Sequence, residues 1–133
     1  MKIEEQVLSR EQMKHLQSLG VDTSDASLVW FMSPKKNQWK IKVKDNFAHE
    51  LLRRISPERY IPTYTIGDLI EKLPIRIGSV NRKIYFTGKY IIVSYSSPDG
   101  SLIEYRGTTL LCLLYSLLCW VAETHKELLE VKK

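Results

Sequence analysis

A run of sixteen residues near the C-terminus, 107–122, carries no charged side chain. As a helix it has almost no polar face, and a helix that is apolar nearly all round is buried nearly all round. It falls short of the roughly 20 apolar residues that a membrane span needs. We therefore predict a core helix over residues 108–122, capped by Thr108 or Thr109.

The same helix is also a predicted interface. Either the sheet and the other helices enclose it completely, or part of it is covered by a second copy of the chain. In the second case we expect a homo-oligomer or another protein partner. The predicted oligomer interface consists of Leu110, Leu114, Leu117 and Val121.

Both cysteines, Cys112 and Cys119, lie within this run. Seven helical residues span roughly 10 Å at about 1.5 Å per residue, which is beyond disulfide reach. We predict two free thiols that pack as small buried apolar side chains, and such thiols favour a reducing compartment. A surface pair that bridges two protomers is the alternative.

The composition predicts an ordered, cytoplasmic protein. The chain has 133 residues, 44% hydrophobic and 26% charged, as in an average globular protein. We predict a single domain over residues 1–133 that needs no metal or disulfide to fold. Because the polar segment 1–5 begins no secretory signal, the cytoplasm is the expected location, with no membrane association. The net charge of +5 slightly favours an anionic partner.

Local signals in the first half predict a helix and a hairpin. Ser9 and Gln12 fit a capping box, so a helix should begin at Arg10 and end before Gly20. Residues 28–32 form a β-prone apolar run, and apolar and lysine residues alternate over 39–43. Joined by a turn at 33–37, these two runs predict a β-hairpin.

The middle of the chain is less regular. A helix is predicted over 45–55, whereas prolines at 57 and 62 mark the next stretch as a packed connection.

The second half predicts a short helix and a meander. Thr65 can cap a helix that Pro74 ends. Strands over 84–86, 90–95 and 102–105 are separated by turns, with the permissive Gly100 in the second, and residues 75–80 can extend this sheet. The predicted fold is therefore α+β: an antiparallel sheet, made of the N-terminal hairpin and the C-terminal three-stranded meander, packs against helices, with a buried C-terminal helix.

The sequence contains no metal or cofactor signature. His15, His49 and His125 lie in three different segments without ligand spacing, and the cysteines lack C-x-x-C spacing. Each histidine is interpreted as a surface or half-buried side chain. We predict no metal site and no cofactor.

Catalytic residues are equally hard to assign. Asp22, Asp25, Glu50 and Glu58 could supply acid–base chemistry, but no second group is positioned to separate their pKa values. Asp22 and Asp25 flank Thr and Ser residues, which predicts hydrogen bonds in a local turn or cap. Because there is also no nucleophile elbow or phosphate loop, we expect no enzymatic activity. A pocket with converging polar groups would indicate the opposite.

The first hairpin offers the most suggestive cluster of charge. Five lysines lie within residues 35–44, close to Trp30, Phe31 and Trp39. A basic strand face with exposed aromatic side chains can hold phosphates and stack bases. However, Trp39 alternates with the lysines, which predicts a core tryptophan beneath a solvated lysine face. The predicted nucleic-acid contacts are Lys35, Lys36, Lys40, Lys42, Lys44, Arg53 and Arg54.

Three segments carry a family resemblance: LGVDTSDAS at 19–27, DLIEKLP at 68–74, and the apolar run 110–120. In these the chain resembles small proteins from bacterial phage-like and mobile-element gene neighbourhoods, especially of Bacteroidetes. That group carries no established activity, so the resemblance implies no functional residue. The leading hypothesis is a non-enzymatic accessory or protein-interaction domain, and the second is a nucleic-acid-binding module that uses the basic hairpin.

Overall fold

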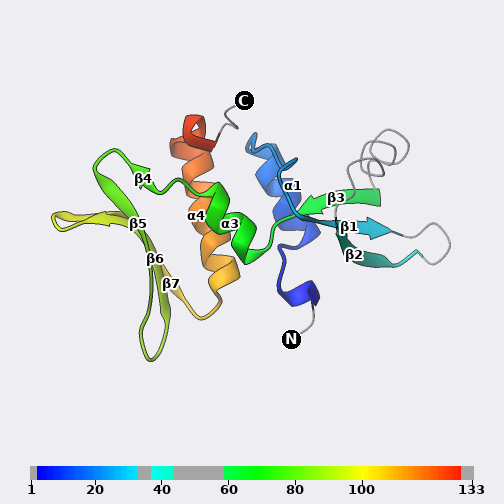
Figure 1. Ribbon diagram of the computed structural model, residues 1–133, viewed down its shortest axis with the longest axis horizontal. Coiled ribbons are helices and arrows are strands. Elements are labelled where there is room, and N and C mark those ends of the chain that lie inside the picture. Colours follow the sequence, from blue (N-terminus) through cyan, green and yellow to red (C-terminus); the bar gives the residue numbers. More distant parts are fainter. Residues whose placement is uncertain (1–2, 33–36, 44–58, 130–133) are drawn as a thin grey trace. The chain divides into compact units, whose positions relative to one another are not determined.

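The computed structural model describes residues 3–32, 37–43 and 59–129. It consists of helices and two antiparallel sheets, which confirms the predicted α+β class (Figure 1). The chain forms two compact units, Met1–Asp68 and Leu69–Lys133. The single domain over residues 1–133 stays a prediction.

The described residues of the first unit form one complete α-helix and a three-stranded sheet in the order β2-β1-β3. Its elements are the 3-10 helix η1 (Ile3–Glu5), α1 (Arg10–Ser18), β1 (Leu28–Met32), β2 (Trp39–Val43) and β3 (Tyr60–Thr63). The predicted turn at 33–37 lies mostly, and the predicted helix at 45–55 wholly, outside the described residues.

Both ends of α1 follow the local prediction. The Gln12 backbone N–H donates to Ser9 Oγ, and the Ser9 backbone N–H donates to Gln12 Oε1, which completes the capping box. At the other end Gly20 adopts a φ of 88°, a left-handed conformation that costs glycine little. The Val21 N–H then bonds the Leu16 carbonyl, as in a Schellman motif.

The predicted hairpin of β1 and β2 is confirmed, but β1 also pairs with a strand that the sequence did not predict. Strand β3 runs antiparallel to β1 and places Pro62 opposite Val29. Proline cannot donate to a ladder and is tolerated on an edge strand, which is the position of β3. The prediction of a packed connection, based on the two prolines, was therefore wrong for residues 60–63, which form a strand.

The core of the first unit gathers around the Leu8 segment. The Leu8 carbonyl accepts hydrogen bonds from Trp30 Nε1 and Thr63 Oγ1, on two different strands. Met13 and Leu16, on the inner side of α1, are fully buried. Packing and hydrogen bonding therefore hold the N-terminal segment to this sheet.

The second unit is an antiparallel meander with a helix against it. Its strands have the order β4-β5-β6-β7, which confirms the meander and its extension by a short first strand. The α3 helix begins before the unit boundary and ends within this unit. The elements are α3 (Ile66–Lys72), β4 (Arg76–Ile77), β5 (Val80–Phe86), β6 (Ile91–Ser97), β7 (Gly100–Gly107), α4 (Leu110–Thr124) and the 3-10 helix η3 (Lys126–Leu129).

Helix α4 begins two residues later than the predicted start at 108. Thr109 is its N-cap residue, yet the Thr109 side chain makes no capping hydrogen bond, and only its carbonyl accepts, from Leu113 N–H. The helix contacts β6 and β7 and buries most of its leucines, so its predicted place in a core is confirmed. No helix among the described residues is long and apolar enough to cross a membrane.

Candidate functional site

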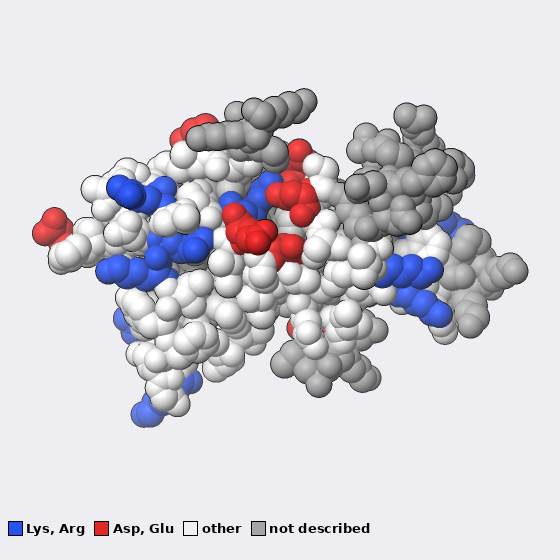
Figure 2. Space-filling view, in the orientation of Figure 1, with Lys and Arg blue, Asp and Glu red and all other residues white. Residues whose placement is uncertain are grey.

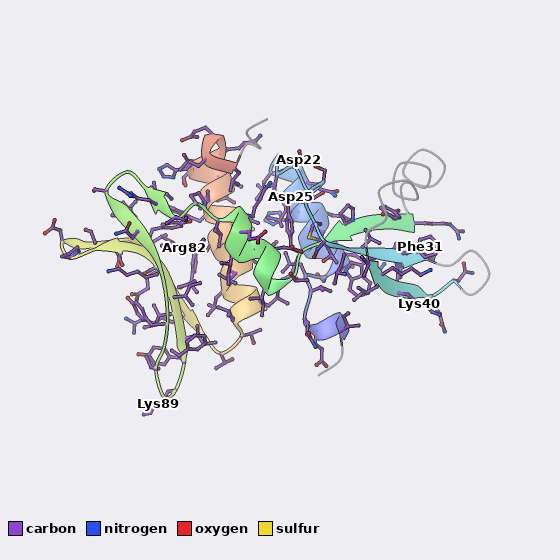
Figure 3. All side chains as sticks on the ribbon, in the orientation of Figure 1. Asp22, Asp25, Phe31, Lys40, Arg82 and Lys89 are labelled. Atoms are coloured by element: carbon purple, nitrogen blue, oxygen red, sulfur yellow. The ribbon has the colours of Figure 1, made fainter. Side chains whose placement is uncertain are left out.

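Two of the predicted nucleic-acid contacts are described, Lys40 and Lys42, and both are exposed on β2. The hairpin register places Lys40 opposite Phe31 and Lys42 opposite Val29, so these four side chains share one face. Phe31 and Lys40 are labelled in Figure 3. The remaining predicted contacts lie outside the described residues: Lys35, Lys36, Lys44, Arg53 and Arg54.

Trp39 lies on the opposite face, as predicted. It pairs with Met32 in the register, and the Arg10 guanidinium carbon lies 4.4 Å from the Trp39 ring centroid. Phe31 does share the lysine face, and Lys42 Nζ lies 4.7 Å from the Phe31 ring centroid. In a cation–π contact of this kind the ammonium group lies against the ring face and covers it.

The rest of that face is largely buried. Val29 and Tyr60, which neighbour Phe31 in the sheet, are both buried, and Phe31 itself is half-buried. The face therefore presents charge from Lys40 and Lys42 but little aromatic surface on which an unpaired base could stack.

A second basic and aromatic surface lies on the four-stranded sheet. One face of this sheet is covered by α4: Trp120 stacks on Tyr95 with ring centroids 6.1 Å apart. Tyr105 lies on the same face, where burial raises its pKa and the neighbouring Cys119 and Glu123 of α4 add to the increase. Successive strand residues point to opposite faces, so the residues directly before and after Tyr95 and Tyr105 in each strand face away from α4.

The register assembles that other face in rows across three strands. Tyr85 of β5, Ile92 of β6 and Arg106 of β7 form one row. Lys83, Ser94 and Glu104 form the next row. Ser94, in the middle of this row, is fully buried. We call Lys83, Tyr85, Tyr90 and Arg106 the aromatic–basic face.

Contacts within the aromatic–basic face orient its arginine. Arg106 Nε donates to Glu104 Oε2 at 2.8 Å, and the guanidinium carbon lies 5.7 Å from the Tyr90 ring centroid. The hydrogen bond to Glu104, together with that carboxylate's charge, raises the pKa of Arg106. Tyr85 remains 42% exposed and the Arg106 side chain 58% exposed. A ring and a fixed cation are therefore both accessible.

The charge of this sheet is basic. Residues 76–107 contain five basic and two acidic side chains. Figure 2 shows Lys and Arg side chains over the four-stranded sheet, and Figure 3 shows Lys89 at the tip of the β5–β6 hairpin. Sequence reasoning missed this surface, although the signal was present: Lys83 and Tyr85 occupy alternate positions of one strand, and Glu104 and Arg106 those of another.

The predicted oligomer interface is mostly core. Leu114, Leu117 and Val121 are fully buried within the single chain, and Leu110 is half-buried. A fully buried side chain does not reach a second copy, so only Leu110 of this set lies at the surface. Homo-oligomerisation itself stays a prediction.

The cysteines differ from their predicted burial. Cys112 is exposed, which makes the prediction of two buried thiols wrong, whereas Cys119 is half-buried. Burial raises the pKa of Cys119, and burial and a hydrogen bond with Cys119 raise that of Tyr115 to about 12.

The acidic residues of the first unit act structurally. Asp22 Oδ1 accepts from the Ser24 backbone N–H at 3.0 Å, which confirms its predicted turn role. Asp25 accepts from the buried Tyr64 hydroxyl at 2.6 Å, a contact across 39 residues that local reasoning does not reach. Its predicted local hydrogen bond stays a prediction. Asp22 and Asp25 are labelled in Figure 3. Glu50 and Glu58 lie outside the described residues.

Two histidines are described, and both lie as predicted: His15 is exposed and His125 is half-buried. His49 lies outside the described residues. Within residues 3–32, 37–43 and 59–129, no group of three or more His, Cys, Asp or Glu side chains is arranged to hold a metal ion.

Comparison of the chain with family models, with curated proteins and with solved structures gave no match.

Proposed function

We propose that this chain is a binding protein for single-stranded nucleic acid and that it binds through the aromatic–basic face. The observation that carries the proposal is the row in which the exposed Tyr85 ring and the oriented Arg106 guanidinium lie on one sheet face. Lys83 lies on the same face, one row away.

The chemistry of such a face suits unpaired nucleotides. Aromatic rings stack bases without regard to sequence, and Lys and Arg neutralise phosphates. Arg106 is held by Glu104 and Tyr90, which reduces the rotamer entropy that binding a phosphate would otherwise cost. The aromatic–basic face supports the function better than the β1–β2 face, where Lys42 covers the Phe31 ring and Tyr60 is buried.

The test is fluorescence anisotropy of a labelled poly-dT oligonucleotide at low salt. We expect Tyr85→Ala to weaken binding by about 1–3 kcal/mol, the typical value of one stacked base. Lys83→Ala should weaken binding and make the salt dependence shallower, because one fewer phosphate is neutralised. Lys126→Ala, on η3 and away from the sheet, is the matched control and should leave binding unchanged.

A second pair of variants separates the two basic surfaces. If the basic hairpin is the binding site, Lys40→Ala with Lys42→Ala should abolish binding while Tyr85→Ala has no effect. That result would move the site to the first unit. Flat anisotropy for the wild-type protein at low salt would end the proposal for both surfaces.

The second candidate function is the non-enzymatic accessory or protein-interaction domain, of the phage-like kind that the sequence resemblance implies. Its support is apolar surface on the second unit, where Phe86 and Leu102 are exposed at strand positions. Two results together would favour this function: the wild-type protein captures a protein partner in a pull-down, and it shows no nucleic-acid binding in anisotropy.

A further inference from the structure

Strand β7 is the long free edge of the four-stranded sheet. It spans eight residues, Gly100–Gly107, and pairs with β6 on one side. Among the described residues, no backbone hydrogen bond links Gly100–Gly107 to any element other than β6. Its outer side therefore presents the row of backbone donors and acceptors that pairs readily with another strand.

The other sheet edges carry features that discourage such pairing. Strand β2 has Lys40 and Lys42, β3 has Pro62 within four residues, and β4 is only two residues long. Short length, lysine and proline are the usual protections of an edge. Strand β7 has a bulge at Leu102, where its register with β6 shifts, but residues 103–107 beyond it form a regular ladder without proline or lysine. The two charges in this part, Glu104 and Arg106, have opposite signs.

These two charges make the edge complementary to itself. Glu104 and Arg106 lie two residues apart on one face, with Tyr105 between them. When two copies of β7 pair antiparallel about a two-fold axis at Tyr105, Glu104 of each copy lies opposite Arg106 of the other. Opposite charges directly across a ladder stabilise the pairing, whereas like charges destabilise it.

We infer that two copies of this chain associate by antiparallel pairing of their β7 strands, centred on Tyr105. The two-fold axis is perpendicular to the sheet, so the aromatic–basic faces of both copies lie on the same side of one continuous sheet. The inference does not depend on nucleic-acid binding. It also places the oligomer interface on β7 instead of on the buried leucines of α4.

The ladder covers residues 103–107 of each copy, a small interface, so we expect a dimer that forms with rising protein concentration. Sedimentation equilibrium in reducing buffer, without nucleic acid, measures this directly. Glu104→Arg places arginine opposite Arg106, and Arg106→Glu places two glutamates opposite each other. Each single variant should raise the dimer dissociation constant at least about tenfold, by like-charge repulsion across the ladder.

The double variant Glu104→Arg with Arg106→Glu restores opposite charges across the axis and should restore the dimer. Asp99→Arg, in the exposed β6–β7 turn outside the paired residues, is the control for the change in net charge. Circular dichroism melts check that each variant is folded; the exposed Glu104–Arg106 contact contributes little to folding.

Three outcomes would overturn the inference. The first is a wild-type protein that stays monomeric at every concentration. A monomer whose β7 edge binds only extended peptides of other proteins counts as this outcome. The second is a dimer that both single variants leave unchanged. The third is a dimer that Leu110→Arg dissociates while Glu104→Arg does not, because the interface then lies on α4.

Discussion

The guanidinium of Arg82 on β5 lies 2.6 Å from the carbonyl oxygen of Ile70 on α3, and the same Nη1 atom donates to the Leu73 carbonyl at 3.0 Å. The last carbonyls of a helix lack intrahelical partners and carry partial negative charge. One strand side chain therefore both satisfies the C-terminus of α3 and links it to the sheet. Tyr95 repeats the connection by donating to the Pro74 carbonyl at 2.7 Å.

Replacing Arg82 by methionine should destabilise the second unit. The Arg82→Met variant keeps a long apolar stem but removes two hydrogen bonds from a charged donor, and we expect a loss of about 1.5–3 kcal/mol in the free energy of unfolding. Urea denaturation followed by circular dichroism measures the change. Arg76→Met, at an exposed position on β4, is the matched control. Equal losses in both variants would show that the contact with Ile70 adds nothing.

Tyr64 should make the protein sensitive to alkaline pH. Its hydroxyl donates to Asp25 Oδ1 and to the Asp22 carbonyl, and burial, reinforced by the Asp25 contact, raises its pKa well above the ordinary value. A group whose pKa is raised on folding contributes stability that is complete below its unfolded pKa of about 10 and is lost at higher pH. The free energy of unfolding should therefore fall as the pH rises above about 10.

The variant Tyr64→Phe isolates this effect from that of Tyr95, whose pKa burial also raises. At neutral pH it should lose about 0.5–1.5 kcal/mol, the typical net value of a hydrogen bond. Its stability should then decrease less steeply above about pH 10 than that of the wild type. Tyr85→Phe, at an exposed tyrosine, is the control. Parallel pH profiles for the wild type and Tyr64→Phe would contradict the prediction.

The two thiols should react at different rates. Cys112 is exposed, whereas burial raises the pKa of Cys119 and lowers its thiolate fraction at a given pH. Labelling with an aromatic disulfide reagent near pH 8 should show a fast and a slow phase. Cys112→Ala should remove the fast phase and Cys119→Ala the slow one. A single rate shared by both thiols would mean that α4 does not bury Cys119.

Predictions from neighbouring residues were the most accurate. The capping box of Ser9 and Gln12, the end of α1 at Gly20 and the turn at Gly100 all involve partners a few residues apart, and each forms as expected. Period-2 alternation likewise located β2, and β-prone runs bounded by turn residues located β1 and the meander. Strand β3 was not predicted, because a proline argues against a strand when only the sequence is known. Its pairing with β1 shows that it lies at an edge, where proline is tolerated.

The candidate site was much harder to anticipate. The sequence located the lysine cluster beside Phe31, but it could not show that Lys42 would cover that ring. It gave no sign that Tyr85, on β5, and Arg106, on β7, share a row. Such a row depends on the register of two ladders, and a shift of one residue would turn every side chain to the other face.

The sequence by itself determined the ends of α1, most strands and the apolar character of α4, because backbone capping and local hydrophobic patterns act over a few residues. Only the tertiary structure decided which side chains meet. Tyr64 reaches Asp25, Arg82 reaches Ile70, Cys112 is exposed and β7 lies at an edge of its sheet. These outcomes depend on strand order and register, which are set by contacts between residues far apart in the chain.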